Sequence, residues 1–195
     1  MSAGARLQIA AALLLTSPFV PLLFQGEEWA ASSPFHYFTA HEDEELGRQV
    51  AEGRRKEFAA FGWDPQQILD PQDPDTFAQS QLRWDERTSG RHAEMLAWHR
   101  ALIQLRQQRP SLRDGRLGDV RTSFDEERGL LHVVRGDLGI FCNLSDADTT
   151  VDLPGAQTVL LASDAEAQLA GGRLHLPHES VVIGDVANGA EIGSA

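Results

Sequence analysis

The spacing of hydrophobic residues changes about half-way along the chain, from a helical period to the short runs of β-strands. In the clearest helical stretch, Trp98, Leu102 and Leu105 recur at four- and three-residue intervals, which places them on one helix face. Pro110 ends this helix, because proline cannot continue the helical hydrogen-bond ladder. The helices predicted in this half cover Ala3–Leu15, Glu42–Phe61 and Arg91–Arg109.

After Leu117, the hydrophobic residues gather in short runs rich in Val, Leu and Ile, separated by Gly, Asp, Ser or Pro. Such runs, about ten residues apart, are typical of an antiparallel sandwich or barrel. We interpret Asp125–Gly129 as a hairpin turn. The change of pattern predicts a first domain over residues 1–112 and a C-terminal antiparallel β-domain over residues 113–195.

One apolar run, Phe19–Phe24, fits neither pattern, because it is flanked by proline and followed by Gly26, Glu27 and Glu28. A continuous apolar run of this length is typical of a strand buried on both faces. Carboxylates directly after it would lie at the strand's C-terminal end, where α/β sheets and barrels bind ligands. A parallel strand needs neighbouring strands, and nothing else before residue 113 predicts one. We therefore expect this portion to be the end of a larger fold.

Charge and composition exclude several classes of function. The chain has 195 residues, is 42% hydrophobic and carries a net charge of −12, so it can bury a core but would repel the phosphates of a nucleic acid. Its single cysteine, Cys142, allows no intrachain disulfide, which fits a reducing cytoplasm. No dinucleotide or P-loop fingerprint occurs, and we expect no cofactor.

Secretion is the weaker interpretation of the N-terminal residues. Arg6 and the apolar stretch Leu7–Leu15 resemble the start of a signal peptide. Pro18 and Pro21 interrupt the apolar run, however, and acidic residues lie just before Ala30, where cleavage would have to occur. The run is also too short for a membrane span, so we expect a cytoplasmic protein without membrane contact.

Two groups of residues suggest metal binding but lack the required spacing. Asp70, Asp73 and Asp75 lie in a proline-rich stretch that we predict to form turns and extended segments, without a helix. No calcium loop has this spacing, so these aspartates are interpreted as turn formers. His92 and His99 lie near one helix face, but no third ligand accompanies them, so no metal site is expected.

Four stretches occur together and in order: QGEEW at residues 25–29, FHYFTAH at 35–41, ELGRQVAEGRRKEF at 45–58 and DPQDPDTF at 70–77. As a set they resemble the malto-oligosyltrehalose trehalohydrolases, a family within the α-amylase superfamily of glycoside hydrolases. The resemblance spans roughly Leu7–Leu112. It implies an α+β fragment, in which the last strand and helices of a (β/α)8 TIM barrel precede a small antiparallel β-sandwich domain.

The resemblance implies hydrolysis of the α-1,4 bond next to the terminal trehalose unit of malto-oligosyl-trehalose, which releases trehalose. In the superfamily the catalytic carboxylates come from barrel strands that precede the last one. No Asp or Glu occurs before Glu27 in this sequence, so we expect no catalytic residue here and no activity of the chain alone. The missing barrel portion on another chain is one partner that this interpretation leaves open.

Five residues are expected to contact malto-oligosyl-trehalose or a maltodextrin: Glu28, Trp29, Phe35, Tyr37 and Phe38. The apolar C–H faces of sugar rings pack on aromatic planes, and a loop after a barrel strand is well placed to offer them. The aromatic side chains could instead attach the long loop to the barrel, and Glu28 could orient a neighbouring backbone group or arginine.

Two other functions compete with the trehalohydrolase interpretation. A non-catalytic carbohydrate-binding or interaction module could be built on the β-domain, although all four tryptophans precede Leu117. The chain could also be a fragment of another amylase-superfamily enzyme, such as a branching enzyme. The FHYFTAH and DPQDPDTF stretches favour the trehalose-releasing family.

Overall fold

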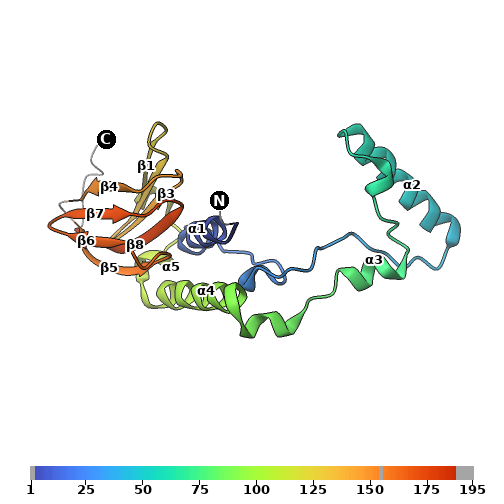
Figure 1. Cartoon of the computed structure of the whole chain (residues 1–195), viewed down its shortest axis with the longest axis horizontal. Coiled ribbons are helices and arrows are strands. Elements are labelled where there is room, and N and C mark those ends of the chain that lie inside the picture. The colour runs from blue at the N-terminus through green and yellow to red at the C-terminus, as the bar shows by residue number, and fades with distance from the viewer. Residues whose placement is uncertain (1–2, 154–155, 188–195) are drawn as a thin grey trace. The chain divides into compact units, whose positions relative to one another are not determined.

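The computed structural model describes residues 3–153 and 156–187, which fall into two compact units (Figure 1). We call residues 1–30 with 87–195 the sheet unit, and residues 31–86 the loop unit. The helices are α1 (Ala3–Thr16), α2 (Glu44–Ala60), α3 (Pro74–Gln79), α4 (Gly90–Gln108) and α5 (Pro110–Arg113). The 3-10 turns are η1 (Glu27–Trp29), η2 (Pro65–Gln67), η3 (Trp84–Thr88) and η4 (Leu117–Asp119).

The strands of the sheet unit form two antiparallel sheets. One has the order β1-β2-β3-β8-β5 and the other the order β4-β7-β6. The strands are β1 (Val120–Asp125), β2 (Leu130–Arg135), β3 (Leu138–Asn143), β4 (Thr149–Asp152), β5 (Ala156–Ala162), β6 (Gln168–Ala170), β7 (Arg173–Leu176) and β8 (Ser180–Val186). The predicted antiparallel β-domain is confirmed, with β1 and β6 as additional strands that the hydrophobic runs did not predict.

Side chains of the five-stranded sheet alternate between two separate hydrophobic cores, as the period of two along a strand requires. On β3, Ile140 and Cys142 face a core shared with α1 and α4, while Phe141 faces a core shared with the three-stranded sheet. The sheet unit therefore has three layers: two helices, the larger sheet and the smaller sheet (Figure 1).

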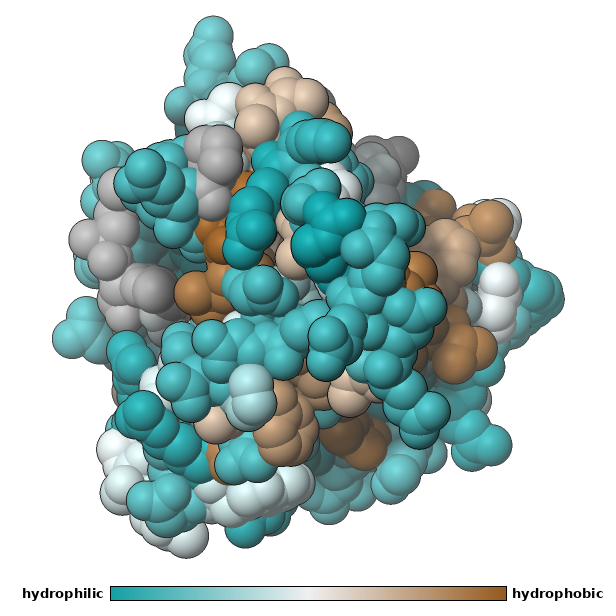
Figure 2. Space-filling model, turned by 90° about the vertical axis from the view of Figure 1, so that its right-hand side faces the viewer, coloured by the Kyte–Doolittle hydropathy of each residue, from teal (hydrophilic) through white to brown (hydrophobic). Residues whose placement is uncertain are grey.

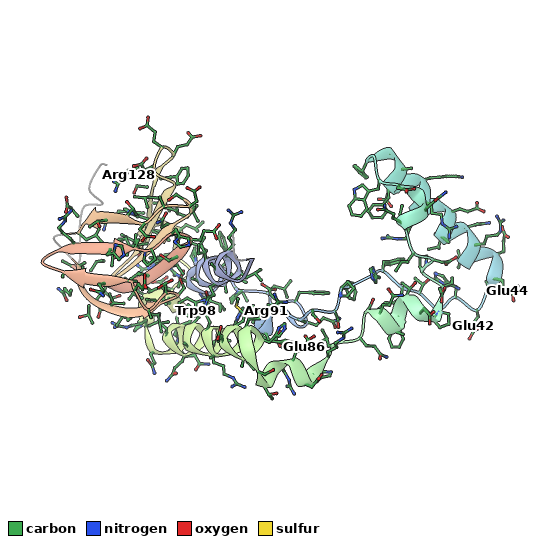
Figure 3. All side chains as sticks on the ribbon, viewed as in Figure 1. Glu42, Glu44, Glu86, Arg91, Trp98 and Arg128 are labelled. Carbon is green, nitrogen blue, oxygen red and sulfur yellow. The ribbon has the colours of Figure 1, made fainter. Side chains whose placement is uncertain are left out.

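The helices α1 and α4 pack against each other and against the same sheet face. Small residues such as Ala11 and Ala12 let α1 approach closely, and the indole Nε1 of Trp98 on α4 donates a 3.0 Å hydrogen bond to the carbonyl of Gln8 (Figure 3). The predicted boundary between residues 112 and 113 thus falls inside one compact unit, because its two sides share a core. As a division into domains it stays a prediction.

The predicted strand over Phe19–Phe24 is wrong for this structure, in which the segment has no regular secondary structure. Most of its apolar side chains are exposed, and Val20 reaches 94%. A strand forms only when a neighbour accepts and donates its backbone hydrogen bonds, and no strand among the described residues pairs with this one. The fold therefore shows the antiparallel sandwich but not the last strand of a barrel.

Two arginines hold the start of that segment instead. Arg106 of α4 donates to the carbonyls of Leu15, Ser17 and Phe19, at 2.7, 2.8 and 2.9 Å. Arg135 of β2 is buried and donates to the carbonyl of Thr16. These bonds satisfy carbonyls at the C-terminal end of α1, which have no partner within the helix. Desolvation by burial lowers the pKa of both guanidinium groups, and the charge of Arg106 lowers that of Arg135 further.

The helix α3 corrects a second expectation, since the proline-rich stretch was predicted to contain none. Asp73 is its N-cap, where the side-chain Oδ1 accepts a 2.9 Å hydrogen bond from the amide of Asp75, and Pro74 is the first helical residue. Both residue types favour a helix start at these positions.

Within the described ranges, none of the helices combines the length and apolar character that crossing a membrane requires.

Candidate functional site

The QGEEW stretch forms a tight turn in the sheet unit. Gly26 has φ +81°, a left-handed conformation that suits glycine, and the 3-10 turn η1 begins directly after it. The carboxylate of Glu27 accepts a 3.0 Å hydrogen bond from the amide of Phe24, so it closes its own turn. Glu28 is half-buried beside it. The two adjacent carboxylates therefore have different surroundings: Glu27 is exposed and accepts the hydrogen bond from Phe24, whereas Glu28 is half-buried and does not take part in that bond.

Trp29 is packed inside the sheet unit with only 1% of its surface exposed. Its carbonyl accepts a 2.9 Å hydrogen bond from Nδ1 of His92 on α4, and the guanidinium of Arg87 lies 5.8 Å from the centre of its ring. Since a carbonyl only accepts, His92 carries its proton on Nδ1. In this arrangement the backbone of Trp29 attaches η1 to the first turn of α4, and its buried ring packs near Arg87 of η3.

The FHYFTAH loop of the loop unit has no regular secondary structure and is held in place mainly by side chains of the DPQDPDTF stretch. Gln72 binds it at two residues: its Oε1 accepts from the Thr39 hydroxyl at 2.6 Å and from the His41 amide at 3.2 Å, and its Nε2 donates to the His41 carbonyl at 3.2 Å. Ser80, just after α3, accepts from the His36 amide at 3.0 Å. These bonds fix the backbone of the loop.

The helix α2 also comes close to the same glutamine, because Gly47 carries no side chain. A Cβ at residue 47 would lie 2.6 Å from Nε2 of Gln72, which is closer than non-bonded atoms approach. Only glycine fits here without moving the glutamine. The sequence stretches that occur together are therefore in contact: α2, the loop and the DPQDPDTF stretch meet at Gln72.

The aromatic side chains of the loop are partly exposed and lie in two groups within the loop unit. Phe38 makes edge contacts with Phe35 and Phe77, with ring centres 6.1 and 5.0 Å apart. Tyr37, 45% exposed, lies under the guanidinium of Arg54 on α2, which is 4.2 Å from the ring centre.

The second group also includes Phe58 and Trp63. The guanidinium of Arg54 lies 5.0 Å from the ring centre of Phe58, and the ring centres of Phe58 and Trp63 are 5.3 Å apart. We call Tyr37, Arg54, Phe58 and Trp63 the aromatic row. Of these, the sequence analysis singled out only Tyr37. The helical spacing of Arg54 and Phe58, which puts them on one face of α2, was a signal that could have found those two residues, whereas Trp63 lies beyond the end of the helix.

The predicted site residues are thus placed in both units. Glu28 and Trp29 belong to the sheet unit, whereas Phe35, Tyr37 and Phe38 belong to the loop unit. The face of the molecule in Figure 2 is mainly hydrophilic, in keeping with the net charge of −12, and its hydrophobic side chains gather in separate areas.

The remaining candidates have structural roles. Asp70 accepts a 2.9 Å hydrogen bond from the amide of Gln72 in a turn, as expected of a turn former. For Asp73 and Asp75 that expectation is wrong, because Asp73 caps α3 and Asp75 lies in the first turn of this helix. Nδ1 of the buried His99 lies 3.1 Å from the Met95 carbonyl of its own helix. Cys142 is buried, and desolvation raises the pKa of its thiol to about 12. Among the described residues, no group of three or more His, Cys, Asp or Glu side chains could hold a metal ion.

Comparison with known proteins identifies relatives of nearly the whole chain. It is 46% identical to a malto-oligosyltrehalose trehalohydrolase of Brevibacterium helvolum over 171 residues, which are 88% of this chain and 29% of that protein. It is 41% identical over 177 residues to the enzyme of the same name from Rhizobium sp. (strain M-11), covering 91% of this chain and 30% of that protein. The resemblance to the malto-oligosyltrehalose trehalohydrolases is confirmed. The chain spans less than a third of the length of these trehalohydrolases.

Family and structure comparisons agree with the likeness to trehalohydrolases. A profile for a domain of unknown function (DUF3459) matches residues 115–183. A Salmonella typhimurium protein provisionally described as an α-amylase is 32% identical, with a TM-score of 0.76 over 95% of this chain and 31% of its own. Trehalulose synthase MutB, at 17% identity and a TM-score of 0.60, shares the fold alone.

Proposed function

We propose that this chain is part of a cytoplasmic glycosidase that hydrolyses the α-1,4 bond next to the terminal trehalose unit of malto-oligosyl-trehalose and so releases trehalose. The observation that carries the proposal is the 41–46% identity to trehalohydrolases over most of the chain. The contacts of Gln72 support it, because they bring together in space three of the sequence stretches on which the resemblance to this family was based.

In this proposal the loop unit offers a surface on which glucose rings of the substrate pack. Phe35, Tyr37 and Phe38 expose aromatic planes, and the aromatic row extends that surface to Trp63, which is also exposed. Aromatic planes bury the C–H faces of sugars, and the polar edge of Tyr37 can bind a hydroxyl group. Glu28 would accept a hydrogen bond from a sugar hydroxyl, while the buried Trp29 positions the turn that carries it.

The cleavage step in this proposal uses carboxylates outside these 195 residues. A retaining glycosidase needs a nucleophile and an acid/base carboxylate about 5 Å apart. The carboxylate of Glu27 is held by the Phe24 amide, and no acidic residue precedes it in the sequence. The chain would then contribute substrate contacts to an active site completed by residues of a barrel, carried either on a longer form of this protein or on another chain.

A chimera tests the proposal. These 195 residues would replace the matching region of the Brevibacterium helvolum trehalohydrolase, and maltotriosyl-trehalose would be the substrate. We expect trehalose as the product, and no trehalose from the 195-residue chain alone. A folded chimera that releases no trehalose, or that makes branched glucan, would overturn the proposal.

The sugar-binding role of the loop has its own variants in the same chimera. Tyr37→Ala should raise KM by about 2- to 10-fold, since aromatic packing contributes roughly 0.5–1.5 kcal/mol. Phe61→Ala is the matched control, because Phe61 is also an exposed ring of the loop unit but lies outside the aromatic row. Equal effects of the two substitutions would contradict the assignment of Tyr37.

A further inference from the structure

A hollow of about 640 Å³ opens on the β-sandwich between the β1–β2 hairpin and the edge strand β4, and the proposed function does not use it. Its volume lies within the usual range of small-molecule sites, about 300–1,000 Å³. We call it the hairpin hollow. Both sides of its opening are free edges, since β1 ends the five-stranded sheet and β4 ends the three-stranded sheet among the described strands.

The hollow contains a buried imidazole with an unused hydrogen-bonding atom. His132 of β2 is 6% exposed and lines the hollow, and its Nε2 has no hydrogen-bond partner among the described residues. Desolvation, and then the charge of Arg128, lower the pKa of His132, while Asp125 opposes them, so the ring is neutral near pH 7. A buried polar atom without a partner is costly, which favours a ligand that supplies one.

Neighbouring groups on the same sheet face determine which ligand chemistry fits. Ser123 lies directly across from His132 in the register of β1 and β2, and Asp125 lies across from Leu130, so their side chains share the face of the imidazole. Leu130 and Val151 provide apolar surface. The lining thus combines a hydroxyl, a carboxylate, a neutral imidazole and apolar surface.

The charge of the rim excludes anions. Glu126, Glu127 and Asp152 line the hollow together with Asp125, against a single cation, Arg128. Arg128, labelled in Figure 3, comes from the hairpin turn and is engaged with β4, where its Nη2 donates to the Thr150 carbonyl at 2.9 Å. Phosphates and carboxylates would be repelled, and no metal-binding cluster exists among the described residues.

We propose that the hairpin hollow binds a neutral sugar, as a glucan contact distinct from the loop unit, with hydroxyl groups paired to His132 Nε2, Ser123 and Asp125. A pyranose ring offers several hydroxyl donors for carboxylates and C–H faces for Leu130 and Val151. The choice of an α-1,4-glucan as the ligand rests on the proposed function, whereas the hollow and its polar groups do not.

Titration of the whole 195-residue chain with maltotriose, followed by the ¹⁵N resonances of the histidine rings, tests the proposal. We expect the Nε2 resonance of His132 to shift in a saturable way. Ser123→Val should weaken this binding at least tenfold, because it fills the space opposite His132 with methyl groups and removes the hydroxyl. Thr122→Val is the matched control, because Thr122 is the preceding residue of β1 and faces the opposite side of the sheet.

Three results would overturn the inference: no shift of His132, a shift that Ser123→Val leaves unchanged, or equal weakening by Thr122→Val. In the first case the imidazole holds only water. The outcome is separable from the proposed function, since Tyr37→Ala should reduce maltotriose effects in the loop unit without changing the His132 titration. If the chimera releases trehalose but maltotriose does not shift the His132 resonance, the proposed function stands and only the sugar-binding role of the hairpin hollow is refuted.

Discussion

At the scale of single residues, burial decides what the reactive side chains can do. Cys142 lies in β3 within the core shared with the helices, and the raised pKa of about 12 keeps its thiol protonated at ordinary pH. The sequence could not predict that His132 would be buried as well, because a histidine between apolar residues of a strand can point to either face.

The thiol should therefore report unfolding. At pH 8, we expect a thiol reagent to modify Cys142 in the folded chain about 10³-fold more slowly than in urea, from the loss of thiolate alone. Ellman's reagent, with absorbance followed over time, measures both rates. Rapid reaction without urea would show that β3 opens or that the core is looser than described.

The lowered pKa of His132 predicts a loss of stability in mild acid. The unfolded chain binds a proton at this histidine near pH 6.5, while the folded chain binds it only at lower pH. The free energy of unfolding is therefore unaffected by this histidine above about pH 6.5 and decreases as the pH falls below that value. Thermal melts between pH 7.5 and 5 should show a smaller decrease for His132→Gln than for the unchanged chain. Equal decreases would contradict the shifted pKa.

At the scale of elements, local signals were sufficient where an element depends on its own sequence. The period of Trp98, Leu102 and Leu105, with Pro110 after them, predicted α4 to within one residue at each end. The helix α3 was missed because three prolines were interpreted as breakers, although Pro74 at the first helical position favours a helix. Its capping residue, Asp73, was a usable signal.

The contact between α2 and Gln72 could not be predicted, because a glycine in a helix carries no information about its neighbours. It gives a testable difference between two glycines of one helix. Gly47→Ala should displace Gln72 and reduce the hydrogen-exchange protection of the His41 amide at least tenfold, whereas Gly53→Ala, with nothing within 4 Å, should leave it unchanged. Gly53→Ala should also stabilise α2 by up to about 1 kcal/mol.

Hydrogen exchange measured residue by residue tests the protection of the His41 amide in the two variants. Thermal unfolding of each variant tests the effect on stability. If both alanines leave His41 equally protected, Gln72 has room to move without releasing the loop. The stretches that meet at Gln72 would then be related by something other than this contact.

At the scale of the whole molecule, the layering of the sheet unit was the least predictable feature. Helices that precede residue 113 and strands that follow it share one core, and periodicity along the chain cannot show which apolar faces meet. The exposed run Phe19–Phe24 is the converse case. Its composition favours a buried strand, but a strand requires a partner, and sequence reasoning had already found none before residue 113.

Because α1, α4 and the five-stranded sheet share one core, we expect residues of α4 to stabilise both the sheet and α1. Leu102 is 1% exposed in that core, so Leu102→Ala should lower the free energy of unfolding by about 2–5 kcal/mol. Ile103 is the next residue but is partly exposed, so Ile103→Ala should cost less than about 1.5 kcal/mol. Urea unfolding followed by circular dichroism of the strands measures both; equal effects would show that the helices are not bound to the sheet as described.

Two arginines from later elements bind the C-terminal end of α1, and this has a consequence for the order of folding. Arg106 and Arg135 bind carbonyls that lie 91 and 119 residues earlier in the sequence. During synthesis from the N-terminus, the apolar run after α1 leaves the ribosome long before either arginine exists. It therefore spends this interval without the bonds that later fix its start, exposed to chaperones and to other nascent chains. The start of this run is thus made well before the two residues that anchor it.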